Sequence, residues 1–159
     1  MAKVFSLYLS TQTASGPYAP LNTTNFSSIT WNINWNALYG GVGFQGEERM
    51  ARVKFEIRSL SQSAVLTDAN NTGVLAIQGL GNQYSNSANG LVLGMVQPAN
   101  EPVAAGTNHI LIGDSLETLG VQCNLPYGYA PITVILLDRT GAFMSGTTNY
   151  QIILQFEME

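Results

Sequence analysis

Hydrophobic and polar residues alternate along several stretches of this chain with a period of two. The clearest case is residues 51–58, where Ala51, Val53, Phe55 and Ile57 fall on one side. The residues between them are all charged: Arg52, Lys54, Glu56 and Arg58. Successive side chains of a β-strand point to opposite faces, so this pattern predicts a strand with one buried and one wet face.

Other stretches predict further strands, of two kinds. The same alternation appears in residues 3–9, 29–36 and 150–157. Residues 91–96 and 132–137 are apolar on both sides, which indicates strands that are covered on both faces or that meet another chain with their outer face. Shorter candidates are residues 74–78, 109–112 and 119–123.

Glycine, proline and asparagine separate nearly all of these segments, and no segment has the pattern of an amphipathic helix of normal length. The connections are uneven, with long ones at 10–28 and 79–90, and residues 138–141 begin a loop rather than a tight hairpin. About eight or nine short strands predict an all-β fold, an antiparallel β-sandwich with jelly-roll or Greek-key topology. Nothing divides the chain, so we expect one domain over residues 1–159.

The composition is unusual in its charge. Only 10% of the residues are charged, against about 25% in ordinary soluble domains, while 45% are apolar. Asn, Gln, Ser, Thr and Gly take the place of the charges. Burying a neutral polar group costs far less than burying a charge, so this surface suits contact with other subunits or glycans. The alternative is a surface that simply uses neutral polar groups.

The charge balance argues against nucleic-acid binding. The net charge is −4, and the basic residues Arg49, Arg52, Lys54 and Arg58 are interleaved with Glu47, Glu48 and Glu56. Binding to phosphates needs a clear excess of Lys and Arg. Residues 47–58 are close to neutral, so they do not provide such an excess.

Candidate catalytic and cofactor motifs are incomplete. Residues 41–46 read Gly-Val-Gly-Phe-Gln-Gly, but the helix that a dinucleotide-binding motif must open is missing, because the strand at 51–58 follows. His109 is the only histidine, which excludes metal sites with two histidines, and we interpret it as a residue at a strand edge. No nucleophile motif accompanies it. We therefore expect no enzyme activity, no catalytic residues and no cofactor.

Three further groups could carry chemistry, and each has a structural interpretation that fits better. Cys123 lies in an apolar alternating run without a basic neighbour, so we expect a buried thiol. Asp114, Glu117 and Asp138 match no calcium-loop spacing, so we expect no metal site. A single cysteine also excludes an internal disulfide, and together with the lack of a signal-peptide pattern it favours a reducing intracellular compartment. No stretch has the ~18–20 apolar residues of a membrane span.

Aromatic residues give the one candidate contact site. Trp31 and Trp35 share a strand face with isoleucines, which favours the core over a sugar-stacking surface. Tyr127 and Tyr129 flank Gly128 in a loop bounded by prolines, and we expect these three residues to form an exposed, rigid contact loop.

Strands from end to end, a neutral polar surface, one cysteine and no catalytic site together resemble the single jelly-roll capsid proteins, minor capsid or penton-type, of large icosahedral double-stranded DNA viruses. Residues 132–138 followed by 150–157 are similar to the closing strands of such domains. The resemblance implies a structural protein of the virion that packs against other capsid subunits, as a homo-oligomer and without catalysis. The alternative is a carbohydrate- or receptor-binding β-sandwich module, which would expose an aromatic residue beside carboxylates. A small β-barrel enzyme is a third class, which the single histidine disfavours.

Overall fold

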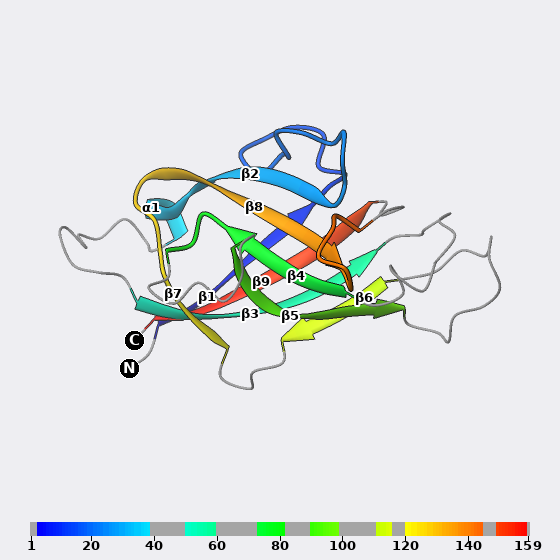
Figure 1. Cartoon of the computed structure of the whole chain (residues 1–159). Coiled ribbons are helices and arrows are strands. Elements are labelled where there is room, and N and C mark those ends of the chain that lie inside the picture. Colours follow the sequence, from blue (N-terminus) through cyan, green and yellow to red (C-terminus); the bar gives the residue numbers. More distant parts are fainter. Residues whose placement is uncertain are drawn as a thin grey trace.

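The computed structural model describes residues 3–38, 50–59, 73–81, 90–98, 111–115, 120–144 and 149–158. Nine strands and one short helix lie in these ranges (Figure 1). They are β1 (Lys3–Ser10), β2 (Ser28–Asn34), α1 (Trp35–Leu38), β3 (Met50–Ser59), β4 (Gly73–Gln78), β5 (Leu91–Pro98), β6 (Leu111–Ser115), β7 (Val121–Asn124), β8 (Tyr129–Asp138) and β9 (Tyr150–Met158). The predicted all-β antiparallel fold is confirmed.

The strands pair in a nested order. β1 pairs with β9, β2 with β8 and β4 with β5, all antiparallel. β3 pairs with both β7 and β6, which lie beside its first and second halves and therefore act as two pieces of one strand. The first strand thus meets the last, the second meets the next to last, and so on inward. This nesting is the topology of a jelly roll.

The nested pairs join into one curled sheet in the order β1-β9-β3-β6-β5-β4-β8-β2, with β7 beside β3. Figure 1 shows β2 and β8 at the top of the curl and β3 and β5 at the bottom. Both halves of the sheet turn their apolar residues inward, where one main cluster of buried side chains forms the core.

The core is centred on β9, which lies between β1 and β3. Its residues alternate strictly: Tyr150, Ile152, Leu154, Phe156 and Met158 are buried, and the residues between them are not. Aromatic rings gather around this strand. The Trp31 and Tyr150 ring centroids lie 6.2 Å apart, and those of Trp35 and Phe156 lie 5.7 Å apart, both edge-on.

Both tryptophans are completely buried, so the prediction that they belong to the core is confirmed. Trp35 does not continue strand β2 as the alternation predicted, however. It begins α1 instead, where the Asn34 side-chain oxygen accepts a hydrogen bond from the backbone N–H of Ala37 at 3.2 Å. An asparagine that accepts from the first turn is a typical helix N-cap, and it competes with the strand.

The two runs that are apolar on both sides, residues 91–96 in β5 and 132–137 in β8, differ in how far their outer side chains are buried. In β8, Ile135 and Leu137 of the outer side are buried with Ala76 in a second, smaller cluster. In β5, Met95 is 45% exposed. The pairing with β4 shifts register between Leu75 and Ala76, which leaves one extra residue in β5. This bulge turns Val96 inward and Met95 outward, so the second half of β5 is not covered on both faces within this chain; the alternative, that its outer face meets another chain, stays a prediction.

The connection that follows β8 begins with a tight turn, which the ten-residue spacing did not predict. The Asp138 carboxylate accepts hydrogen bonds from the backbone N–H of Thr140 at 2.8 Å and from its hydroxyl at 2.6 Å. Gly141 adopts a φ of +84°, which favours glycine. The chain then returns along β8, and the N–H of Met144 donates to the carbonyl of Leu136 at 2.9 Å.

The alternation of β9 predicts that substitutions of two neighbouring isoleucines change the stability of the protein by unequal amounts. Ile152 is completely buried, whereas Ile153 is 43% exposed on the outer face. We expect Ile152→Ala to lower the free energy of unfolding by about 2–5 kcal/mol, because it leaves a cavity in the core. Ile153→Ala serves as the control and should cost less than about 1 kcal/mol. Chemical denaturation measures both values, and equal losses would contradict the register of β9.

Candidate functional site

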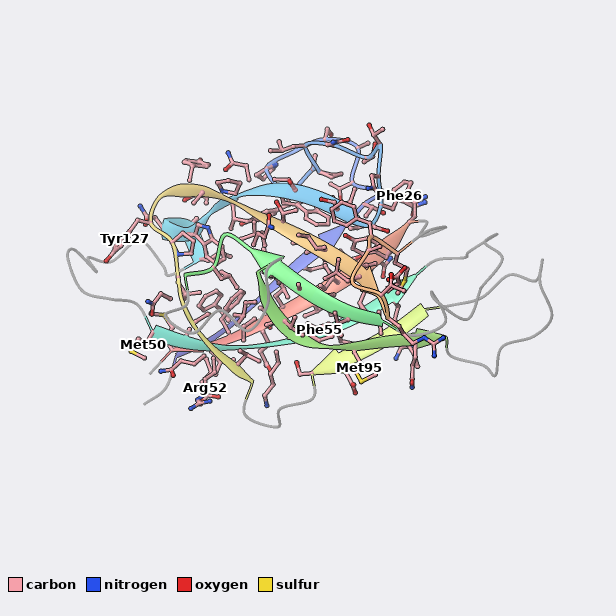
Figure 2. The ribbon with its side chains drawn as sticks, viewed as in Figure 1. Phe26, Met50, Arg52, Phe55, Met95 and Tyr127 are labelled. Atoms are coloured by element: carbon pink, nitrogen blue, oxygen red, sulfur yellow. The ribbon has the colours of Figure 1, made fainter. Side chains whose placement is uncertain are left out.

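Tyr127 and Gly128 lie between β7 and β8, and Tyr129 is the first residue of β8, at the end of the molecule where α1 is found; we call these three residues the aromatic turn. Tyr127 is 50% exposed and Tyr129 is 72% exposed. Figure 2 shows the Tyr127 side chain at the outer left end of the molecule, away from the core that holds Phe55. The predicted exposure of this loop is confirmed, while its role in contacts stays a prediction.

The aromatic turn is held by hydrogen bonds to α1. The carbonyl of Gly128 accepts from the backbone N–H of Trp35 at 2.9 Å, and the N–H of Gly128 donates to the Asn36 side-chain oxygen at 3.3 Å. The Trp35 indole N–H donates to the carbonyl of Ala130 at 3.1 Å. Gly128 has a φ of +60°, a conformation that a side chain would strain. Since Trp35 is itself buried, the turn is fixed to the core.

A neutral surface continues from the aromatic turn, because Tyr129 pairs with Asn34 at the end of β2. The outward side chains of β2 and of the first half of β8 are uncharged, and the hydroxyls of Thr30 and Thr133 hydrogen-bond to each other at 2.8 Å. We call this surface the neutral face; its residues are Thr30, Asn32, Asn34, Pro131 and Thr133.

Most of the charged residues of the described chain gather elsewhere, on the outer face of β9, β3 and β6; the others are Lys3 in β1, Asp138 at the end of β8 and Arg139 after it. This charged face contains Arg52, Lys54, Glu56, Arg58, Asp114 and Glu157. Glu56 stands directly opposite Asp114, and the Arg58 guanidinium forms an ion pair with Glu56 at 3.1 Å. Arg52 lies opposite Glu157 in the ladder. Figure 2 shows Arg52 and Met95 pointing away from the core on the lower side.

Two hollows lie on the charged face. The larger has a volume of about 640 Å³ and is lined by Glu56, Arg58, Met95, Gln97, Ile112 and Asp114, among others. The smaller, of about 280 Å³, lies between β1, β3 and β9 and includes Ser6, Lys54 and Ile153. Both are open grooves between side chains of the sheet surface. Neither was predicted, because each brings together residues from strands that are far apart in the sequence.

The acidic residues considered for a metal site are not brought together. Asp114 lies in β6, and Asp138 is the last residue of β8, where the Thr140 hydroxyl and backbone N–H groups of the following turn hold the pKa of its carboxyl below the usual range. Within the described ranges, no group of three or more His, Cys, Asp or Glu side chains is placed to hold a metal ion. Glu117, His109 and the glycine motif at 41–46 lie outside the described residues.

Cys123 is buried in β7, as predicted, and burial raises the pKa of its thiol from 9.0 to about 12. A thiol that stays protonated at neutral pH is a poor nucleophile. This arrangement fits a structural residue of the core.

No family model, curated protein or solved structure matches this chain. None of the helical segments in the described part of the chain is long and apolar enough to cross a membrane.

The raised pKa of Cys123 predicts that the folded protein loses stability at alkaline pH. The unfolded thiol ionises near pH 9, whereas the folded one stays protonated to about pH 12. The contribution of this group to stability is therefore complete below pH 9 and is lost as the pH rises toward 12. We expect Cys123→Ala to reduce the dependence of the free energy of unfolding on pH between about 9 and 12, as measured by chemical denaturation.

The burial of Cys123 also predicts that a thiol reagent at pH 8 modifies it only after denaturant is added. Rapid modification of the native protein would contradict the burial.

Proposed function

We propose that this chain is a structural subunit of a virus capsid that works through contacts with other subunits and carries no catalytic function. The observation that carries the proposal is the separation of charge on its surface. The neutral face and the aromatic turn form one continuous uncharged surface, while most charged residues of the described strands gather on the charged face.

The neutral face is suited to burial in an interface. Its outward groups are hydroxyls and amides, which lose little on leaving water if they find hydrogen-bond partners, whereas a charge loses several kcal/mol. The hydroxyl pair of Thr30 and Thr133 is already satisfied within the chain. Association over this face would therefore desolvate no charged group of the face itself.

The aromatic turn adds the apolar anchor that such interfaces usually contain. Tyrosine is enriched at the centre of protein interfaces because it covers a large area and loses little rotational freedom. Here the backbone that carries Tyr127 and Tyr129 is bonded to Trp35 and Asn36, so its order is in place before binding. A preorganised loop lowers the entropic cost of association.

The jelly roll is compatible with this function and does not select it alone. Jelly rolls form viral capsid domains, and they also form lectin domains. A lectin-type site would combine an exposed aromatic ring with a carboxylate. Residues 118–137, which include the aromatic turn, contain no charged residue, and both tryptophans are buried. These observations favour the capsid subunit, and a carbohydrate- or receptor-binding module is the second candidate because of the two exposed tyrosines of the aromatic turn.

The test compares association of the wild-type chain with that of Tyr127→Ser/Tyr129→Ser. We expect light scattering at two concentrations to give a discrete oligomer for the wild type. The double variant should dissociate at least tenfold more readily, since each buried tyrosine contributes more than about 1 kcal/mol. Met95→Ser on the outer face of β5 is the control, because Met95 is exposed and lies far from the aromatic turn, and it should associate as the wild type does.

A wild-type chain that stays monomeric at high concentration would contradict the proposal. A glycan screen would then test the second candidate. Glycan binding that the double variant loses would establish a carbohydrate-binding module in place of a capsid subunit.

A further inference from the structure

The curled sheet is open, and its path through the described strands ends at β1 and β2; β7, which lies off this path, pairs with β3 and forms a bridge from Asn124 to Gly81. The hydrogen bonds at one end of β1 show which backbone groups face outward. Beyond the last pair of the ladder, Ser10 and Gln151, the N–H of Thr11 donates to the carbonyl of Tyr150 at 3.1 Å, and the N–H of Tyr150 donates back to the Thr11 hydroxyl at 3.1 Å. Thr11 and Tyr150 therefore occupy a hydrogen-bonding position in the alternation of the ladder. Such pairs alternate along the ladder. The backbone groups of Phe5, Leu7 and Leu9 therefore face β9, and those of Val4, Ser6 and Tyr8 face away from it.

The ladder between β9 and β3 agrees with this alternation. Residues of β9 that bond to β1 cannot also bond to β3, so the residues of β3 that face β9 are the charged ones. The N–H of Phe55 then has to point to the other side of β3. It does so, and it donates to the Ser115 hydroxyl at 2.8 Å.

The edge of β1 carries none of the usual protection against strand pairing. Its eight residues keep an unbroken register with β9, without a bulge or a proline. Val4 and Tyr8 are each 53% exposed, and Lys3 at its start is the only charged residue of the strand. Edges that must stay free normally carry charges, prolines or bulges. Among the described residues, only β9 pairs with β1.

The opposite edge is different, because the chain covers part of it. The carbonyl of Thr30 in β2 accepts from the N–H of Leu21 at 2.8 Å, and the N–H of Ser28 donates to the carbonyl of Asn25 at 3.0 Å. The segment before β2 thus occupies groups of this edge that another strand would need. This leaves β1 as the edge available for pairing.

We propose that β1 pairs antiparallel with β1 of a second copy of this chain, around a two-fold axis at Ser6. Ser6 then stands opposite Ser6 of the second copy, and Val4 stands opposite Tyr8 in both directions. Each copy offers the N–H and C=O groups of three residues, and in this register every one of them finds a partner.

The neighbouring register, centred on Leu7, is less well satisfied. It would place Val4 opposite Ser10, whose carbonyl already accepts from the N–H of Thr13 at 3.3 Å. The Ser10 hydroxyl also accepts from the N–H of Gln12 at 3.2 Å, where the chain turns away. The strand therefore ends as a pairing edge at Tyr8, and Ser6 is the centre of the part that remains.

The side chains match the same register. Val4 and Tyr8 lie on the outer face, where pairs of an aromatic and a β-branched residue stabilise neighbouring strands. Tyr8 already stands opposite Ile153 of β9. The pairing would join Ile153, Tyr8 and Val4 of the second copy into one apolar row across the two sheets, and it would bring no charges of like sign together at its centre.

This pairing deepens the proposed function by naming one subunit contact, and it rests on that function only for its role in a shell. A two-fold contact closes on itself and yields a dimer. A shell needs at least one more contact, which the neutral face and the aromatic turn would supply. The two proposals can therefore fail separately.

Disulfide trapping tests the pairing. Ser6→Cys places a thiol on the two-fold axis, where paired Cα atoms lie about 5.5 Å apart, within the range of a disulfide. Gln155→Cys is the matched control, because Gln155 stands beside Ser6 on the same face but one strand further from the edge. We expect rapid cross-linking of Ser6→Cys into dimers and none of Gln155→Cys. Cys123 is common to both and buried.

A second pair of variants tests the backbone. Ser6→Pro removes the outward N–H without breaking a bond to β9, and proline is tolerated at such edges. Ser6→Thr keeps the N–H. We expect Ser6→Pro to raise the dimer dissociation constant by about a hundredfold, since two hydrogen bonds are lost at the axis, and Ser6→Thr to change it little. Thermal unfolding checks that both variants fold.

Three outcomes would overturn the pairing: equal cross-linking of Ser6→Cys and Gln155→Cys, no cross-linking of Ser6→Cys at all, or an unchanged dimer in Ser6→Pro. A larger oligomer without the Ser6 cross-link would refute the pairing and leave the capsid function intact. A cross-linked dimer that forms no larger assembly, even with the aromatic turn intact, would support the pairing and count against the capsid function.

Discussion

The pairing of the first strand with the last is the constraint on which the rest of this structure depends. β9 lies between β1 and β3, and its inward residues form the centre of the core. The pairing ends in a buried junction, where the Thr11 hydroxyl accepts from the N–H of Tyr150 at 3.1 Å and donates to the Asn149 side chain at 2.9 Å. Every other strand pair is nested inside this one. Closing contacts between such distant residues costs chain entropy, so a jelly roll depends on a large, well-packed core.

The sequence predicted the strands well where one face is buried and the other is wet. In residues 51–58 of β3 and in β9, every second residue is apolar, and the structure buries these alternate residues while the residues between them, Ile153 included, are not buried. The alternation did not predict the structure where a helix cap or a bulge sets the direction of the side chains. Asn34 caps α1 and ends β2 one residue before Trp35, and a bulge in β5 reverses the direction of Met95. Neither the helix cap nor the bulge can be recognised from the alternation of apolar and polar residues.

The candidate site was predictable only in part. The aromatic turn could be predicted because glycine, proline and tyrosine gather within a few residues, and its exposure follows from that local chemistry. The neutral and charged faces could not be predicted, because each joins strands that only the nested pairing makes neighbours. Asp114 comes beside Glu56 through the pairing of β6 with β3, and Tyr129 comes beside Asn34 through that of β8 with β2. The outward edge of β1 likewise emerges from the ladder at Thr11 and not from the residues of β1 alone.

The separation of charge makes the account testable by a single variable, the ionic strength. Salt screens contacts between exposed charges over a distance of about 10 Å at 0.1 M and 3 Å at 1 M, and it does not weaken apolar or neutral hydrogen-bonded contacts in this way. The most direct measurement is the sedimentation velocity of the wild-type chain at one protein concentration across this range of salt. The account predicts association that is unchanged or stronger at high salt. Association that dissolves as salt is added would place the subunit contacts on the charged face and contradict it.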